Sequence, residues 1–311
     1  MDTDFTAAKI ETLIQTTDPT ATLFRWILEL WDAEGVDDDL LNDYYDEREK
    51  ATRRLTWTLN QIYEEFWEKE LLPQVNSRQV SELLQEPRYA LVLMDSLSLR
   101  EACLLRQRLP HHGYDIQALD YAFSELPSDT ATFCRRHWNT SAPSQIRDPH
   151  FVYVSADTPP LDDLTQEQLT VWGTYPDWFW YHAHSGRTEH IPPAEIYHKT
   201  ETLLLALLNR IREHERIIIS SDHGYLGVKA GMAWPTPEPL RTYLKEVLGS
   251  RFETLSDSKK ARALLRAGLI IAHDNHYLIR GRYTGDFGSV YLHGGLSLLE
   301  CLTPWLVIRR K

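Results

Sequence analysis

Apolar and polar positions alternate along residues 87–311 in a pattern typical of a sheet covered by helices. Short apolar runs rich in β-branched and aliphatic residues are separated by longer amphipathic stretches. The runs are "YALVLMD" (89–95), "HFVYVS" (150–155), "RIIIS" (216–220) and "PWLVIRR" (304–310), and two of the helical stretches are "SLREACLLRQRL" and "AEIYHKTETLLLALLNRIREHE". This alternation predicts an α/β fold with a mainly parallel sheet sandwiched by helices.

Residues 1–86 differ in pattern and predict a helical N-terminal region. Apolar side chains recur there at the spacing of one helix face, at Leu23, Ile27 and Leu30 and at Leu55, Leu59, Ile62 and Phe66. Residues 32–50 hold nine carboxylates and two basic side chains, which predicts a solvated, partly helical face or, alternatively, a contact surface for a basic partner. Residues 231–283 interrupt the strand–helix alternation, and we interpret them as a small inserted cap.

Composition narrows the class of protein. The chain has 311 residues and a net charge of −12, so contact with nucleic acid would need a local basic pocket. No apolar run approaches the roughly 20 residues that span a bilayer, so we expect no membrane partner. The acidic start lacks a secretory pattern, and the three cysteines form no Cys-x-x-Cys pair, so we expect a cytoplasmic protein with reduced thiols.

Ligand-type side chains stand where apolar runs end. Asp95 closes the first run, Asp222 and His223 follow "IIIS", and His293 follows another apolar run. Parallel strands collect their carboxyl ends at one edge, where such residues converge, although each alone also fits a polar loop. Carboxylate oxygens combined with imidazole nitrogens suit Zn²⁺, or alternatively Mn²⁺, better than Ca²⁺ or Mg²⁺. The glycines that follow both histidines allow tight turns and the close approach of a ligand.

The motifs "LVLMDSLSLRE", "ELPSDTATFCRR", "HAHSGRTE", "IIISSDHGYL" and "YLHGGLSLLECLTPWLVI" resemble the PglZ domain, a branch of the alkaline phosphatase superfamily. The resemblance covers roughly residues 88–311 and implies an alkaline-phosphatase-like fold with two metal sites. It implies that Asp95, Thr130, Asp222 and His223 hold one metal. The segment "PSDT" would present the nucleophile, with Thr130 as the expected residue and Ser128 as the alternate.

The second metal site implied by the resemblance is where this sequence departs from the pattern. The family holds that metal with an Asp-x-x-x-His element and a late histidine, which match His184 and His293. Trp180 stands where the aspartate is expected, Asp177 lies three residues earlier, and His182 is a substitute ligand. A complete site with two Zn²⁺ ions and a single-metal or catalytically degraded protein both stay open.

The resulting prediction is a metal-dependent phosphodiesterase with a threonine nucleophile. The resemblance implies a phosphate-ester substrate, such as a nucleotide or nucleic-acid diester, and a role in bacterial defence against phage with other defence proteins as partners. Four cations are candidates to bind the substrate phosphate: Arg135, Arg136, Arg187 and Lys229. The alternative is a catalytically degraded scaffold that acts by protein interaction. A mutase of the phosphoglycerate type is weaker, because residues 231–283 are too few for its inserted domain.

Overall fold

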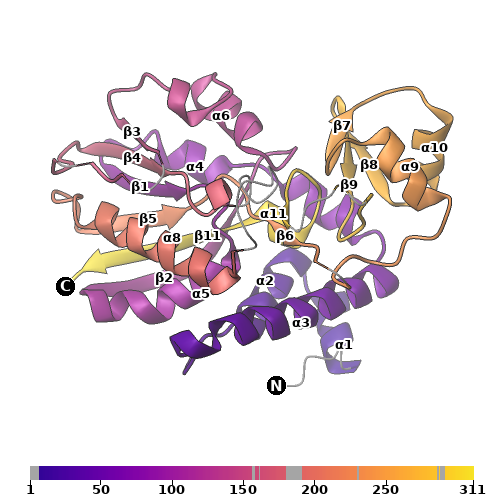
Figure 1. Cartoon of the computed structure of the whole chain (residues 1–311), viewed down its shortest axis with the longest axis horizontal. Helices are drawn as coiled ribbons and strands as arrows, with labels where there is room; N and C mark the ends of the chain where they lie inside the picture. The colour runs from indigo at the N-terminus through magenta and orange to yellow at the C-terminus, as the bar shows by residue number, and fades with distance from the viewer. Residues whose placement is uncertain are drawn as a thin grey trace.

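The computed structural model describes residues 7–155, 158–160, 162–179, 191–229, 231–285, 287 and 291–311, and a six-stranded sheet lies at its centre (Figure 1). In spatial order its strands are β2 (Tyr114–Phe123), β11 (Leu302–Arg310), β5 (Arg216–Ser220), β1 (Tyr89–Met94), β4 (Gln168–Gly173) and β3 (Phe151–Val154). β1 pairs in parallel with β4 and β5, and β3 pairs in parallel with β4. β11 pairs antiparallel with both β2 and β5 and is the one strand of the described sheet that runs opposite to the other five, so the predicted mainly parallel sheet is confirmed.

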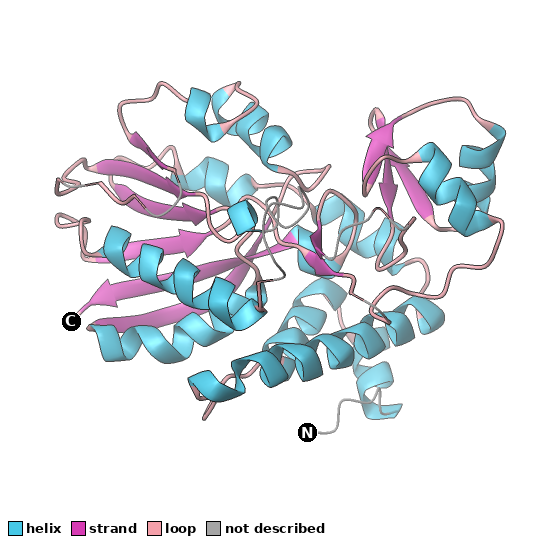
Figure 2. Cartoon of the chain, viewed as in Figure 1, coloured by secondary structure: helices cyan, strands magenta, loops and turns pink. Residues whose placement is uncertain are grey.

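Helices cover both faces of this sheet, as Figure 2 shows. All six residues of β1 are buried, and they divide between two hydrophobic clusters because alternate side chains point to opposite faces. The first cluster contains residues of α5 (Leu99–Arg108) and α8 (Pro193–Leu208), and the second contains residues of α4 (Arg78–Leu83) and α6 (Thr130–Trp138). Within the described ranges, no helix has both the length and the apolar character needed to cross a membrane.

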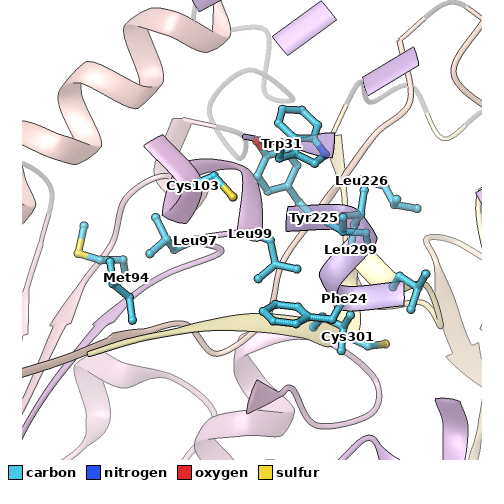
Figure 3. Packing of buried hydrophobic residues seen from close by; sticks show 14 of the residues in the cluster. Phe24, Trp31, Met94, Leu97, Leu99, Cys103, Tyr225, Leu226, Leu299 and Cys301 are labelled. Atoms are coloured by element: carbon cyan, nitrogen blue, oxygen red, sulfur yellow. The ribbon is translucent and has the colours of Figure 1, made fainter. Parts of the chain in front are cut away.

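The N-terminal region is helical, as its pattern predicts, and packs into the same core as the sheet. Its elements are α1 (Ala7–Gln15), α2 (Pro19–Leu30), η1 (Asp38–Leu40), α3 (Leu41–Ile62), η2 (Trp67–Leu71), η3 (Leu72–Gln74) and the helix α4 described above. Figure 3 shows Trp31 of this region near Leu99 of α5 and Tyr225, and all three belong to one cluster. Most of the acidic stretch is solvated, but Glu49 is buried against Arg100, which the charge pattern did not predict.

Residues 231–283 form a small unit of their own secondary structure, coloured orange in Figure 1. It comprises α9 (Leu240–Val247), β7 (Phe252–Thr254), α10 (Lys259–Arg266), β8 (Ile270–His273) and β9 (His276–Ile279), with sheet order β7-β9-β8. A fully buried ion pair joins Arg251 to Glu300 of α11 (Leu298–Cys301), with 2.6 Å between Nη2 and Oε2. This ion pair fastens the unit beside the turn that follows His293. The remaining short elements are η4 (Leu109–His112), η5 (Pro143–Gln145) and the two-stranded ladder of β6 (Leu226–Gly227) and β10 (Tyr291–Leu292).

Candidate metal centre

Asp95, Asp222 and His223 meet at the carboxyl ends of β1 and β5. One ligand atom from each lies within 4.8 Å of the others, and all three residues are buried. They meet because β1 and β5 are adjacent parallel strands, so the residues that follow them share one edge of the sheet. We call these residues the Asp–Asp–His group. The structure thus brings together three of the residues that the sequence assigns to the first metal.

Thr130 places its hydroxyl against this group. Its Oγ1 lies 2.7 Å from Asp222 Oδ2, 3.2 Å from His223 Nε2 and 3.4 Å from Asp95 Oδ1. Thr130 is the first residue of α6, and the preceding Asp129 caps the helix by accepting a hydrogen bond from Thr132 N at 2.6 Å. The partial positive charge of a helix N-terminus therefore lies where a negative oxygen would be bound.

Ser128, the alternate nucleophile, lies elsewhere. Its Oγ is buried, donates to the Gly295 carbonyl at 2.9 Å and accepts from Gly294 N at 3.1 Å. These bonds hold the turn after His293, so of the two hydroxyl residues only Thr130 has its oxygen bonded to the Asp–Asp–His group. This division of roles could not be read from "PSDT", because both residues are small hydroxyl side chains two positions apart.

Hydrogen bonds from the two strand ends fix the orientation of the group. Ser96 adopts a left-handed backbone with φ of 65°, and its N–H donates to Asp222 Oδ1 at 3.1 Å. Trp172 Nε1 of β4 donates to Asp95 Oδ2 at 3.3 Å. His223 Nδ1 lies 3.0 Å from the Gly224 carbonyl, which can only accept, so Nδ1 carries the proton. His223 Nε2 faces Thr130 Oγ1 and lies 3.4 Å from Asp222 Oδ2, so in the neutral ring this nitrogen is the one that would bind a metal.

The two glycines after the histidines lie against other parts of the chain. A Cβ on Gly224 would lie 2.1 Å from the Leu299 carbonyl oxygen of α11. Gly294 has φ of +106°, and a Cβ there would lie 2.4 Å from the ring of Phe252. Both glycines are therefore needed for the close packing of the strand ends against α11 and β7, and the close approach of a ligand stays a prediction.

A second pair of ligand-type side chains adjoins the group. The His293 ring stacks on His223, with 4.3 Å between centroids and 19° between planes, and its Nε2 lies 3.8 Å from Asp177 Oδ1. Asp177 N donates to the Asp95 carbonyl at 3.1 Å, which brings the loop after β4 to this edge despite its unexpected spacing. His293 Nδ1 is buried without a hydrogen-bond partner among the described residues. The other second-site residues, His182, His184 and Trp180, lie outside the described residues.

The electrostatics of the group fit a bound cation. Burial raises the pKa of Asp95 well above its usual value, and the carboxylates of Asp222 and Asp177 raise it further. Burial alone would lower the pKa of His223, but the same two carboxylates raise it, and the net pKa lies above the ordinary value. Burial lowers the pKa of His293, and the neighbouring His223 lowers it further. Two buried carboxylates and an imidazole nitrogen form a donor set that suits Zn²⁺ or Mn²⁺.

The predicted phosphate-binding cations have other partners in the structure. Arg135 is exposed on α6 and donates to Thr132 Oγ1 at 3.2 Å, and Arg136 pairs with Glu125 at 3.8 Å. Lys229 pairs with Asp46 of α3. Their described contacts are therefore not with the Asp–Asp–His group, and Arg187 lies outside the described residues.

Comparison with known proteins adds no relative. A scan against family models gives no match to this chain, and a search of curated proteins gives no similar sequence. The PglZ resemblance therefore depends on the motifs quoted above, and the function must be argued from the site.

Proposed function

We propose that this protein is a metal-dependent phosphoesterase that uses Thr130 as its nucleophile and acts on phosphodiesters. The observation that supports this most strongly is the position of Thr130 Oγ1, 2.7 Å from Asp222 Oδ2 and 3.2 Å from His223 Nε2 at the start of a helix. A helix N-cap that served only folding would not need its next side chain bonded to a buried Asp–His pair.

Different residues of the site would have different roles in the reaction. Asp95, Asp222 and His223 would hold the cation, and Asp177 with His293 would contribute ligands to a second ion. Bound Zn²⁺ or Mn²⁺ would supply positive charge that favours the threonine alkoxide and the phosphoryl oxygens. The hydrogen bond from Thr130 Oγ1 leads to Asp222 Oδ2, which is placed to take the proton as Oγ1 attacks phosphorus. The oxygen–phosphorus bond to Thr130 forms as the bond to the leaving oxygen breaks, and the proton taken by Asp222 passes to that oxygen to give the alcohol. Water then attacks phosphorus, its proton returns to Thr130 Oγ1, and the phosphate monoester is released.

Two further parts of the proposal depend on the PglZ resemblance alone. These are the preference for diesters over monoesters and a role in antiviral defence with protein partners. Turnover of a diester and a monoester can be compared in the same assay, so the first part is open to direct test.

The experiment compares Thr130 variants with a matched control on the same helix. Protein loaded with Zn²⁺ or Mn²⁺ is assayed with bis(p-nitrophenyl) phosphate and p-nitrophenyl phosphate. We expect Thr130→Ala to lose at least about 100-fold in kcat, because it removes the nucleophile. Thr130→Ser should keep substantial activity, and Thr132→Ala, two residues further along α6, should be close to wild type. Equal turnover in wild type and Thr130→Ala would refute the proposal.

A further inference from the structure

A pocket of about 310 Å³ lies between α3 and the β6–β10 ladder. Six of its lining residues carry the argument and define what we call the tyrosine pocket: Tyr45, Glu49, Arg100, Tyr225, Lys229 and Tyr291. Sites for small molecules in proteins commonly begin at about 300 Å³ and are lined by aromatic side chains with a few polar groups. The tyrosine pocket therefore has the size and composition of a ligand site.

The segments that form this pocket also carry the candidate metal centre. Tyr225 follows His223 by two residues, and Tyr291 precedes His293 by two. The two tyrosine rings meet edge to face at 5.7 Å, and the two histidine rings stack at 4.3 Å, so neighbouring positions of the same two segments supply both sites. The N-terminal helix α3 supplies the facing wall. Figure 3 shows Tyr225 beside Trp31, where this helical region joins the sheet.

Buried hydrogen bonds fix the walls of the pocket. Glu101 accepts from the hydroxyls of both Tyr45 and Tyr225, at 3.0 and 2.8 Å. The Arg100 guanidinium lies 4.4 Å from the centroid of the Tyr225 ring and donates Nε to Glu49 at 2.9 Å. These side chains are buried, so the aromatic surface is held rigid before any ligand arrives.

Both signs of charge line the pocket. Arg100 and Arg282 both pair with Glu49, and Lys50 and Lys229 both pair with Asp46. Of the charged residues that line the pocket, Arg100 and Lys229 are cationic, and Asp46 and Glu49 are carboxylates. The lining is therefore balanced in charge on a chain whose net charge is −12, so it repels an anion less than the average surface of the protein does.

We infer that the tyrosine pocket binds the planar aromatic part of a nucleotide-type phosphate ester whose phosphate lies at Thr130. Rigid tyrosine rings bind a flat heteroaromatic group by stacking, and the cation proposed at the Asp–Asp–His group would attract the attached phosphate. The position of the phosphate rests on the proposed function, whereas binding of the aromatic part needs no catalysis. On this account the N-terminal region builds half of the substrate site.

The test fills the pocket without deleting any contact. Gly227 lies in β6, and a Cβ there would lie 3.5 Å from Glu49 Cδ, an ordinary contact, so Gly227→Val adds bulk at the pocket wall in a strand that tolerates valine. Gly249→Val is the matched control, because this exposed glycine does not line the pocket and a Cβ there would lie 3.7 Å from Glu253 Oε2. Saturation-transfer NMR measures binding of the four ribonucleoside 5′-monophosphates and of ribose 5-phosphate to the full chain.

We expect at least one nucleotide to bind wild type, Gly249→Val and Thr130→Ala about 5- to 150-fold more tightly than ribose 5-phosphate, the range that stacking of one base provides. Gly227→Val should lose this difference. If Gly227→Val fails to fold, Lys229→Glu decides, because it should weaken nucleotide binding at least about fivefold and leave adenosine binding unchanged. Equal binding of nucleotides and ribose 5-phosphate to wild type, or an unchanged difference in folded Gly227→Val, would overturn the inference. If nucleotides bind more tightly than ribose 5-phosphate but no phosphoester is turned over, the result counts against the proposed function and not against the inference about the pocket.

Discussion

Replacing Asp95 by asparagine should stabilise the metal-free protein and abolish its stabilisation by metal. The ligand atoms of the Asp–Asp–His group lie within 4.8 Å of one another, and two unit charges that far apart repel by about 3.5 kcal/mol at an effective dielectric constant of about 20. Protonation of Asp95 limits this cost in the folded protein. The asparagine amide has one acceptor oxygen in place of two for its contacts with Trp172 Nε1 and Thr130 Oγ1, which costs about 1 kcal/mol. We therefore expect Asp95→Asn to raise the free energy of unfolding by a net amount of about 1–2 kcal/mol.

The pH dependence of stability should also reflect the repulsion at Asp95. Because the folded state raises the pKa of Asp95, the folded protein holds a proton that the unfolded chain releases near its ordinary pKa of about 4. The stability of the metal-free protein should therefore fall as pH rises above about 4, and Asp95→Asn should flatten this slope.

Urea denaturation measures both effects, with chelator and then with Zn²⁺ or Mn²⁺, from pH 4 to 8. Asp39→Asn, at an exposed aspartate in η1, is the control for loss of one negative charge. The reasoning fails if Asp95→Asn is less stable than wild type in chelator while metal stabilises both proteins equally.

Three further outcomes test the surroundings of the site. Burial lowers the pKa of His137 to about 4. The contribution of His137 to the free energy of unfolding should therefore be full above its unfolded pKa of about 6.5 and should decline by up to about 3 kcal/mol as pH falls towards 4. Urea denaturation of His137→Phe should lack this decline. Arg251→Met leaves Glu300 buried without its partner and should lower the free energy of unfolding by about 3–5 kcal/mol in urea denaturation. Arg262→Met, at an exposed ion pair, should lower it by less than about 1 kcal/mol. Similar losses in the two variants would contradict a structural role for the buried ion pair. Gly224→Ala must displace the backbone of α11, so it should lower the melting temperature and weaken metal binding. An unchanged metal affinity would show that the position of His223 does not depend on this contact.

The centre of the sheet and the Asp–Asp–His group were accessible from sequence because local pattern and topology agree. Apolar runs identified β1, β3, β5 and β11, and the rule that parallel strands end at one edge brought Asp95 and Asp222 together. Two strands of the sheet gave no such signal. β2 is an edge strand with mostly exposed or half-buried residues, and β4 begins directly after a polar stretch, so neither reads as a buried apolar run.

The tyrosine pocket could not be predicted, because its residues are joined only by the tertiary fold. Glu49 is one of nine carboxylates in an acidic stretch, and no local pattern distinguishes it from its solvated neighbours. Its burial depends on Arg100 and Arg282, which lie 51 and 233 residues further along the chain. The location of Asp177 beside His293 has the same origin, since the spacing rule pointed away from it.

Metal content, measured by elemental analysis after purification in metal-replete buffer, tests most directly whether Asp95, Asp222 and His223 hold a cation beside Thr130. We expect at least one equivalent of zinc or manganese in wild type and in Thr130→Ala, and a loss of at least one equivalent in both Asp222→Ala and His223→Ala. A wild-type chain that carries no metal, or folded Asp222→Ala and His223→Ala chains that carry as much as wild type, would contradict the account.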